Sequence, residues 1–222
     1  CLTLPEQAWR YHQGMPTSSQ RRPIAARASR WAQALCRTLA ASAITPNQIS
    51  VASIGFAAAG AAALVWLPGW PGLLLCALGI QLRLLCNLLD GMVAVEGGKQ
   101  SPVGALYNEL PDRVTDSLFL VALGHACGLP WLGWLAALLA ALTAYIRVMG
   151  GALGLAQDFR GPMAKPHRMA VMTAACLLAI IEGLVWHSQH LLTVAAAIIA
   201  AGSALTCLTR TRAIAGLLRQ GA

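Results

Sequence analysis

Apolar stretches long enough to cross a lipid bilayer recur along most of this chain, and they constrain its fold more than any other feature. A helix of about 20 apolar residues spans the hydrocarbon core of a bilayer. With 57% hydrophobic and only 11% charged residues, the chain lies outside the usual range of soluble domains. It predicts an all-α, polytopic membrane protein with six transmembrane helices, roughly at 49–67, 71–93, 105–127, 130–149, 169–186 and 190–208.

The positions of the basic residues predict how these helices are oriented. The short connections at 68–71, 128–130 and 187–190 contain no Lys or Arg, whereas the N-terminal segment, the two longer connections and the C-terminal tail are basic. Cytoplasmic loops are enriched in Lys and Arg, so we expect both termini in the cytoplasm. As a separate expectation, we assign the chain to the inner membrane of a bacterium. Tryptophans typical of a membrane interface gather at the opposite boundary: Trp66, Trp70, Trp131, Trp134 and Trp186.

The N-terminal segment carries an amphipathic helical pattern over residues 24–42. The apolar residues that share one face are Ile24, Ala28, Trp31, Leu35 and Leu39. Such a helix, with arginines around the rest of its surface, lies in the membrane interface. We therefore expect a cytoplasmic segment (1–45), a six-helix membrane domain (46–210) and a cytoplasmic tail (211–222). The net charge of +8 fits this topology and attraction to anionic membrane lipids, and we do not interpret it as a sign of nucleic-acid binding.

Acidic residues are rare in this chain, yet most of them lie together. Of eight Asp and Glu residues, five fall in one short window: Asp90, Glu96, Glu109, Asp112 and Asp116. Helical spacing places Asn87 and Asp90 on one face of the second apolar stretch, and Asn108, Asp112 and Asp116 on one face of the third. Because charge without a partner is costly in an apolar environment, a cation is expected to meet these oxygens. Hard divalent cations such as Mg²⁺ and Mn²⁺ prefer oxygen ligands, and a substrate phosphate would complete the set.

This window resembles the motif of the CDP-alcohol phosphatidyltransferases, Asp-x2-Asp-Gly-x2-Ala-Arg-x8-Gly-x3-Asp-x3-Asp. The spacing matches without a gap, and five motif positions carry the family's residue: Asp90, Gly91, Ala94, Gly104 and Asp112. Thr45-Pro46-Asn47-Gln48 is similar to the family's Thr-Pro-Asn element before the first membrane helix. Ser101-Pro102-x-Gly104 is similar to the choline and ethanolamine phosphotransferase branch.

Three motif positions differ, so the chain resembles a variant form of the family. Asn87 stands at the first aspartate, Asn108 at the third, and Val95 at the arginine. An amide oxygen still coordinates a hard cation, but two negative charges are lost, which lowers the expected metal affinity. Glu109 and Asp116 lie where they could restore that charge.

The resemblance implies a membrane enzyme of phospholipid biosynthesis that binds two divalent ions, Mg²⁺ or Mn²⁺. A phosphatidyl or phospho-alcohol group would move from a CDP-linked lipid donor, for which we expect CDP-diacylglycerol, to a hydroxyl acceptor, and CMP would leave. Asp112 would be the general base. The implied metal ligands are Asn87, Asp90, Asn108, Glu109, Asp112 and Asp116. The implied nucleotide-binding residues are Asn47, Gly91, Ala94 and Gly104, and the phosphate- or acceptor-binding residues are Arg147, Lys165 and Arg168.

Structural roles are open alternatives for several of these residues. Asp90 and Asp112 could form ion pairs with Arg83 or Arg113, and the asparagines could bond between helices. Arg83 is more consistent with pairing to Asp116 or another carboxylate of the site than with substrate contact. The three basic candidates could be determinants of topology alone.

Two other functions are weighed against the enzyme. An inactive relative that binds metal or nucleotide without turnover would account for the two asparagines. A small transporter would distribute charge at the middle of the membrane, whereas these acids collect at one end. Homodimerisation, a property of the resembled family, stays open.

Overall fold

The computed structural model describes residues 29–188 and 190–220, which form seven helices. They are α2 (Arg30–Ala41), α3 (Pro46–Trp66), α4 (Trp70–Val95), α5 (Gly104–Ala126), α6 (Pro130–Ala152), α7 (Lys165–Trp186) and α8 (His190–Gln220). Each of the six apolar stretches coincides with one of the long helices. The last helix continues past the predicted end at 208, through a more polar segment that is still rich in the helix formers Ala, Leu and Arg.

Five of the described helices, α3, α4, α6, α7 and α8, are long and apolar enough to cross a membrane. The sequence predicts six such helices, and α5 is the exception. Its first half carries Glu109, Asp112, Arg113 and Asp116, more charge than a lipid-exposed span tolerates. The described chain is therefore an all-helical protein with five apolar helices and one long polar-to-apolar helix packed among them.

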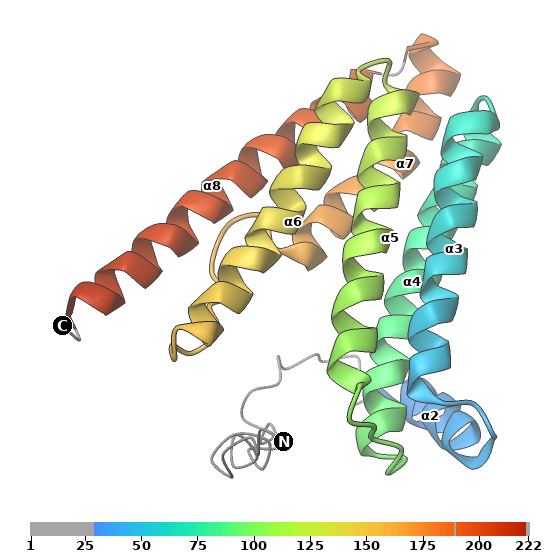
Figure 1. Cartoon of the computed structure of the whole chain (residues 1–222). Coiled ribbons are helices and arrows are strands. Elements are labelled where there is room, and N and C mark those ends of the chain that lie inside the picture. Colours follow the sequence, from blue (N-terminus) through green and yellow to red (C-terminus); the bar gives the residue numbers. More distant parts are fainter. Residues whose placement is uncertain (1–28, 189, 221–222) are drawn as a thin grey trace, which may run out of the picture.

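The six long helices run alternately up and down, so their ends meet at two levels (Figure 1). The segments 96–103 and 153–164 connect helices at the level where α3 begins and α8 ends. Because of this alternation, the end of α4, the beginning of α5, the end of α6 and the beginning of α7 all lie toward the same end of the bundle. The polar window of the sequence falls at that end.

Close packing of glycines brings two helix pairs together. A methyl group built on Gly79 of α4 would lie 2.9 Å from the Cα atom of Gly60 on α3. On the next pair, a methyl group built on Gly124 of α5 would lie 2.6 Å from the Cα atom of Gly133 on α6. Small residues at such contacts let membrane helices approach closely. The core between the helices is filled by larger apolar side chains, among them Ile80, Phe119, Leu123, Met172 and Ile199.

The short helix α2 packs on the end of α4 through its buried residues Ala32 and Cys36. Trp31 and Leu35, which the sequence places on the apolar face, are exposed. One part of the apolar surface of α2 is therefore buried against the protein, and another part stays exposed. Residues 24–28 of the predicted amphipathic helix lie outside the described residues.

Candidate active site

The beginning of α3 is held by a capping box that uses the Thr-Pro-Asn-Gln element. The backbone N–H of Thr45 donates to Oε1 of Gln48 at 2.9 Å, and the N–H of Gln48 donates to Oγ1 of Thr45 at 3.3 Å. This reciprocal arrangement satisfies donors that the first turn of a helix leaves unpaired. Asn47 in the same turn is half-buried, and its amide donates to Oγ of Ser101 at 3.3 Å.

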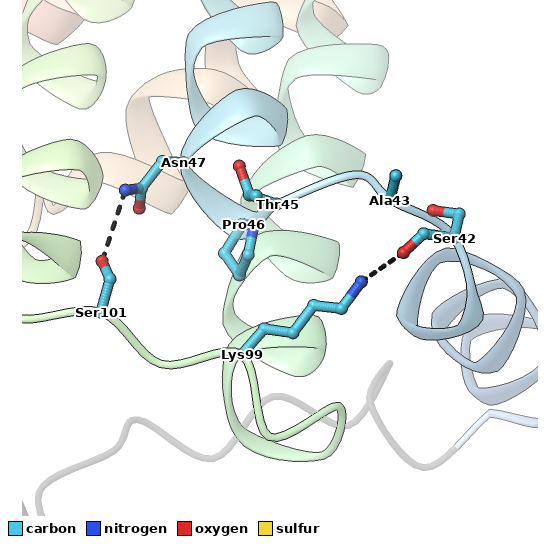
Figure 2. A pocket seen from close by; sticks show the side chains of 7 residues that line it. All are labelled: Ser42, Ala43, Thr45, Pro46, Asn47, Lys99 and Ser101. Atoms are coloured by element: carbon cyan, nitrogen blue, oxygen red, sulfur yellow. Dashed lines mark hydrogen bonds between the residues drawn. The ribbon is translucent and has the colours of Figure 1, made fainter.

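A pocket of about 470 Å³ opens beside this helix start (Figure 2). Its lining residues are Ser42, Ala43, Thr45, Pro46, Asn47, Lys99 and Ser101. The ammonium of Lys99 donates to the carbonyl oxygens of Ser42 and Ile44 at 2.5 and 3.2 Å, and so joins the segment before α5 to the segment before α3. Of the four predicted nucleotide-binding residues, Asn47 lines this pocket, whereas Gly91, Ala94 and Gly104 lie outside its lining.

Asp90 is buried near the end of α4 and faces α3. Its Oδ2 atom accepts a hydrogen bond from Oγ of Ser50 at 2.6 Å, and its Oδ1 atom accepts one from the N–H of Gly91 at 2.5 Å. Ser50 was not singled out in the sequence. Ser50 lies three residues after Asn47 on α3, so the two share a helix face. This spacing is the feature of the sequence that could have indicated Ser50 as a site residue.

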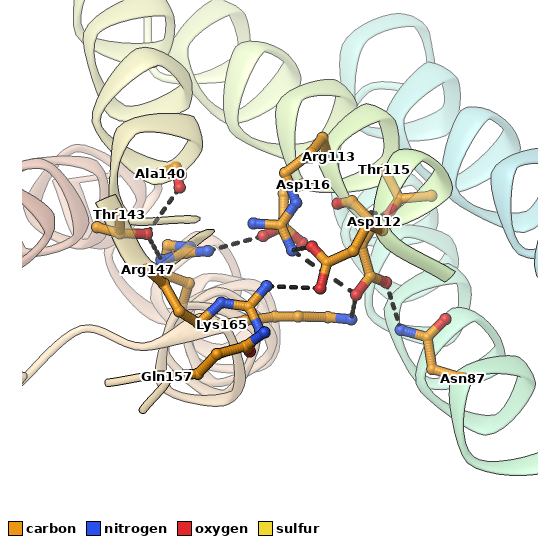
Figure 3. A network of polar contacts seen from close by, with 12 residues as sticks. Asn87, Asp112, Arg113, Thr115, Asp116, Ala140, Thr143, Arg147, Gln157 and Lys165 are labelled. Carbon is orange, nitrogen blue, oxygen red and sulfur yellow. Dashed lines mark hydrogen bonds and ion pairs between the residues drawn. The ribbon is translucent and has the colours of Figure 1, made fainter. Parts of the chain in front are cut away.

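Asp112 lies where three helices meet. Its Oδ1 atom accepts hydrogen bonds from Nδ2 of Asn87 on α4 at 2.7 Å and from Nη2 of Arg83 at 3.2 Å. Its Oδ2 atom pairs with the ammonium of Lys165, the first residue of α7. Figure 3 shows Asn87 and Lys165 directed at Asp112 from different helices. The side chain of Asp112 keeps an exposed fraction of 11%, so it is shielded but still reachable.

Asp116 lies one turn further along α5 and is almost completely buried. It pairs with Arg83 and with Arg168 of α7, both at 2.8 Å. The pairing of Arg83 with Asp116, expected from the sequence, is present. The Arg168 side chain is 1% exposed, and its guanidinium binds Asp116 and the carbonyl oxygen of Met163. Its role in phosphate binding stays a prediction.

Glu109 and Arg147 connect α5 with α6 at the edge of this cluster. Nη2 of Arg147 lies 2.5 Å from Oε1 of Glu109, and its Nη1 donates to Oε1 of Gln157 at 3.1 Å. The Arg147 guanidinium also lies 5.3 Å from the ring centre of Phe159, close enough for a cation–π contact. Asn108, predicted as a metal ligand, has an exposed side chain on the adjacent surface.

In the segment 153–164, Asp158 pairs with Arg160 at 3.0 Å. Burial tends to raise the pKa of Asp158, but the hydrogen bonds and charge of Arg160 outweigh it and hold that pKa below its ordinary value.

The oxygens that a divalent cation could bind lie near the C-terminal end of α4 and in the N-terminal half of α5. Asp90 and Asp112 offer carboxylates, and Asn87 and Asn108 offer amide oxygens, a set of hard donors that suits Mg²⁺ or Mn²⁺. Within residues 29–188 and 190–220, no three Asp, Glu, His or Cys side chains converge on one point. In this structure Lys165 and Arg83 balance the charge of Asp112. The donor set therefore fits a hard cation in its chemistry, with amides replacing half of its carboxylates.

Comparisons with known proteins agree on one kind of protein, although no family model matched the chain. It is 34% identical over 176 residues to the archaetidylinositol phosphate synthase of Aeropyrum pernix, covering 79% of this chain and 85% of that protein. Its fold is similar to that of the phosphatidylinositol phosphate synthase of Mycobacterium tuberculosis. The structure of that enzyme with manganese and citrate gives a TM-score of 0.69 at 21% identity, covering 82% of this chain and 88% of the other. The structure with CDP-DAG bound gives the same score and identity, covering 84% and 94%.

Proposed function

This chain belongs to the CDP-alcohol phosphatidyltransferases, and on that premise we propose which substrates and residues it uses. It is a membrane phosphotransferase of phospholipid biosynthesis that moves a phosphate-linked group from a CDP-activated lipid donor to an alcohol and releases CMP. Mg²⁺ or Mn²⁺ serves as the cofactor. The alternative of an inactive relative has no support in these similarities.

The proposed donor is CDP-diacylglycerol and the proposed acceptor is a phosphorylated polyol of the inositol phosphate class. The names of both relatives specify an inositol phosphate lipid as product. The cluster also holds one more cationic than acidic side chain, which suits an anionic substrate. The cationic side chains are Arg83, Arg113, Arg147, Lys165 and Arg168, and the acidic ones are Asp90, Glu109, Asp112 and Asp116. Lys165 and Arg147, which are partly exposed, are the proposed partners of the acceptor phosphate.

The observation that carries the proposal is the meeting of α4, α5 and α7 at Asp112. As general base, Asp112 would take the proton from the acceptor hydroxyl, whose oxygen then bonds to the lipid-bearing phosphorus as the bond to CMP breaks. Asn87 orients the carboxylate through its hydrogen bond, and Lys165 places positive charge beside it. A divalent cation held by Asn87, Asp90, Asn108 and Asp112 would stabilise negative charge on the phosphoryl oxygens and the leaving group. Glu109 forms an ion pair with Arg147 and is a secondary candidate as a ligand of the cation.

Asn47 and the glycines of the motif are proposed to receive the nucleotide. Asn47 offers an amide at the rim of the 470 Å³ pocket, where a cytidine could hydrogen-bond. Gly91 and Ala94 near the end of α4 and Gly104 at the start of α5 carry little or no side chain, so a diphosphate could approach the backbone there.

We further propose that α5 is a sixth membrane-crossing helix. It packs between α3 and α6, and its charged residues are paired within the protein. In this topology α2 lies in the interface with Trp31 toward lipid, and the site and both termini face the cytoplasm of a bacterial cell. The membrane domain would span 46–210, with the segments 1–45 and 211–222 outside it, and homodimerisation is compatible with this arrangement.

Purified protein in lipid nanodiscs tests the function directly. With CDP-diacylglycerol, Mn²⁺ or Mg²⁺ and a panel of alcohols, we expect cation-dependent release of CMP and a new lipid identified by mass spectrometry. Inositol phosphate should be preferred over inositol, glycerol phosphate and serine. Absence of CMP release with every acceptor and both cations would refute the proposal.

A further inference from the structure

Asp116 is a second buried carboxylate beside Asp112, and both of its oxygens are already used by the protein. Its side chain is 3% exposed. Oδ1 accepts a hydrogen bond from Arg83 and Oδ2 accepts one from Arg168, each at 2.8 Å. The two arginines are themselves buried, with exposed fractions of 0% and 1%. Asp116 is therefore enclosed by two cations that have no access to solvent.

Arg83 connects Asp116 to the proposed base. Its Nε atom donates to Oγ1 of Thr115 at 2.9 Å, while Nη2 also reaches Oδ1 of Asp112 at 3.2 Å and the Asp112 carbonyl at 3.4 Å. The guanidinium of Arg83 on α4 thus contacts three residues of α5: Asp112, Thr115 and Asp116. Arg83 therefore ties Asp116 to Asp112, whose carboxylate is held in place by Asn87 as well.

Arg168 connects Asp116 to the other half of the bundle. Its Nη1 atom donates to the carbonyl of Met163 at 2.9 Å and lies 3.4 Å from Oγ1 of Thr143 on α6. Arg168 is three residues after Lys165, in the first turn of α7. Fixing Arg168 therefore fixes the start of α7, from which Lys165 reaches Asp112.

These contacts join helices that diverge from one another at this end of the bundle. Toward the end of the bundle that holds the site, α6 and α8 diverge from α3, α4 and α5 (Figure 1). Asp116, with its two arginines, bonds α4 and α5 to α7 and, through Thr143, to α6. The contact between Asp112 and Lys165 likewise joins α5 to α7.

We propose that Asp116 is a positioning residue that holds Arg83 and Arg168 so that Asp112 and Lys165 face each other. This inference rests on the function proposed above. It replaces the sequence-based expectation that Asp116 binds a divalent cation. A cation there would have to displace both arginines, leaving the buried Arg168 without a carboxylate partner and Arg83 with Asp112 alone, which is unfavourable. Nη1 of Arg83 and Nε of Arg168 already have no hydrogen-bond partner among the described residues, so the network has no spare acceptor.

Three variants in nanodiscs test this role: Asp116→Asn, Arg168→Met, and the two combined. The measurements are Mn²⁺ affinity by electron paramagnetic resonance, and kcat with KM for donor and acceptor. We expect Mn²⁺ affinity within threefold of wild type in all three. We expect kcat to fall at least tenfold and the acceptor KM to rise, with the donor KM unchanged, since Lys165 moves away from Asp112. The double variant, in which one charge of each sign is removed, should lose no more activity than the worse single variant.

Glu182→Gln is the matched control. Glu182 is a buried carboxylate at the opposite end of α7, where it accepts hydrogen bonds from Ser188 and from the backbone N–H groups of His190 and Leu191. Its loss should lower thermal stability while kcat stays unchanged.

Mn²⁺ binding weakened tenfold or more in Asp116→Asn would overturn the inference in favour of a ligand role. Unchanged kcat, or losses that multiply in the double variant, would also overturn it. If the single variants do not fold, the charge-balanced double variant provides the same measurements. A wild-type protein that releases no CMP would refute the proposed function instead, and the Mn²⁺ titration would still test whether Asp116 is a ligand.

Discussion

Nδ2 of Asn87 lies 2.7 Å from Oδ1 of Asp112, so the end of α4 donates a hydrogen bond to the carboxylate that we propose as the base. The family motif has an aspartate at position 87. Two carboxylates at this distance would repel each other unless a cation lay between them. The amide makes the contact between α4 and α5 independent of a cation.

Replacing this amide by a carboxylate should therefore make the protein depend on metal. In Asn87→Asp we expect a lower melting temperature in chelator and Mn²⁺ binding tighter by about tenfold, since the number of charged ligands helps set the affinity for hard cations. Melting curves with and without Mn²⁺, and a Mn²⁺ titration, check both effects. Gln100→Glu adds one charge to the exposed 96–103 segment and is the control. Equal Mn²⁺ affinities in the two variants would contradict this role of Asn87.

Asp112→Asn tests the proposed base. Removal of a general base typically costs about 10²–10⁴-fold in rate, and we expect CMP release to fall within that range. Asp158→Asn is a close control, because Asp158 is also 11% exposed and paired with an arginine. The Asp158→Asn variant should keep wild-type activity. Retention of more than a tenth of the activity in Asp112→Asn would exclude Asp112 as the base.

Much of this arrangement could be predicted because helical periodicity is local. The apolar runs located the six long helices, and the spacing of Asn87, Asp90, Asn108 and Asp112 placed these side chains at neighbouring helix ends. The charge on α5 is also visible in the sequence, and because of it α5 is less apolar than the other five long helices.

The partners of each side chain could not be predicted, since they depend on which helices become neighbours. Periodicity shows that Asp116 shares a face with Asp112, but not that arginines from α4 and α7 enclose it. Likewise Arg168 and Lys165 are both basic residues at the start of α7, and the sequence assigns them the same role. Packing separates them: Arg168 is buried against Asp116, whereas Lys165 reaches the partly exposed Asp112.

Lys165 should matter more for the acceptor than for the donor. In Lys165→Met we expect the KM for a phosphorylated acceptor to rise by about tenfold or more, because one charge-assisted contact is worth roughly 1.5–3 kcal/mol. The KM for CDP-diacylglycerol should change little. Arg160→Gln, which removes a charge from an exposed side chain of the 153–164 segment, should leave both constants unchanged. A larger effect on the donor KM would assign Lys165 to the donor phosphates.

Glycine packing between α3 and α4 gives a prediction about stability that does not depend on the site chemistry. A methyl group at position 79 would lie 2.9 Å from both the Cα atom of Gly60 and the carbonyl oxygen of Phe56, which are backbone atoms that cannot move aside independently. We expect Gly79→Ala to destabilise the protein by about 1–3 kcal/mol, the usual cost of overpacking. Gly55→Ala on α3 is the control, since a methyl group there meets nothing within 4 Å, and it should be neutral or stabilising. Thermal unfolding, with both variants purified in one detergent, measures their stability. Equal melting temperatures would mean that α3 and α4 do not pack through these glycines. Since the placement of α4 brings Asn87 to Asp112, that result would also contradict the geometry of the site.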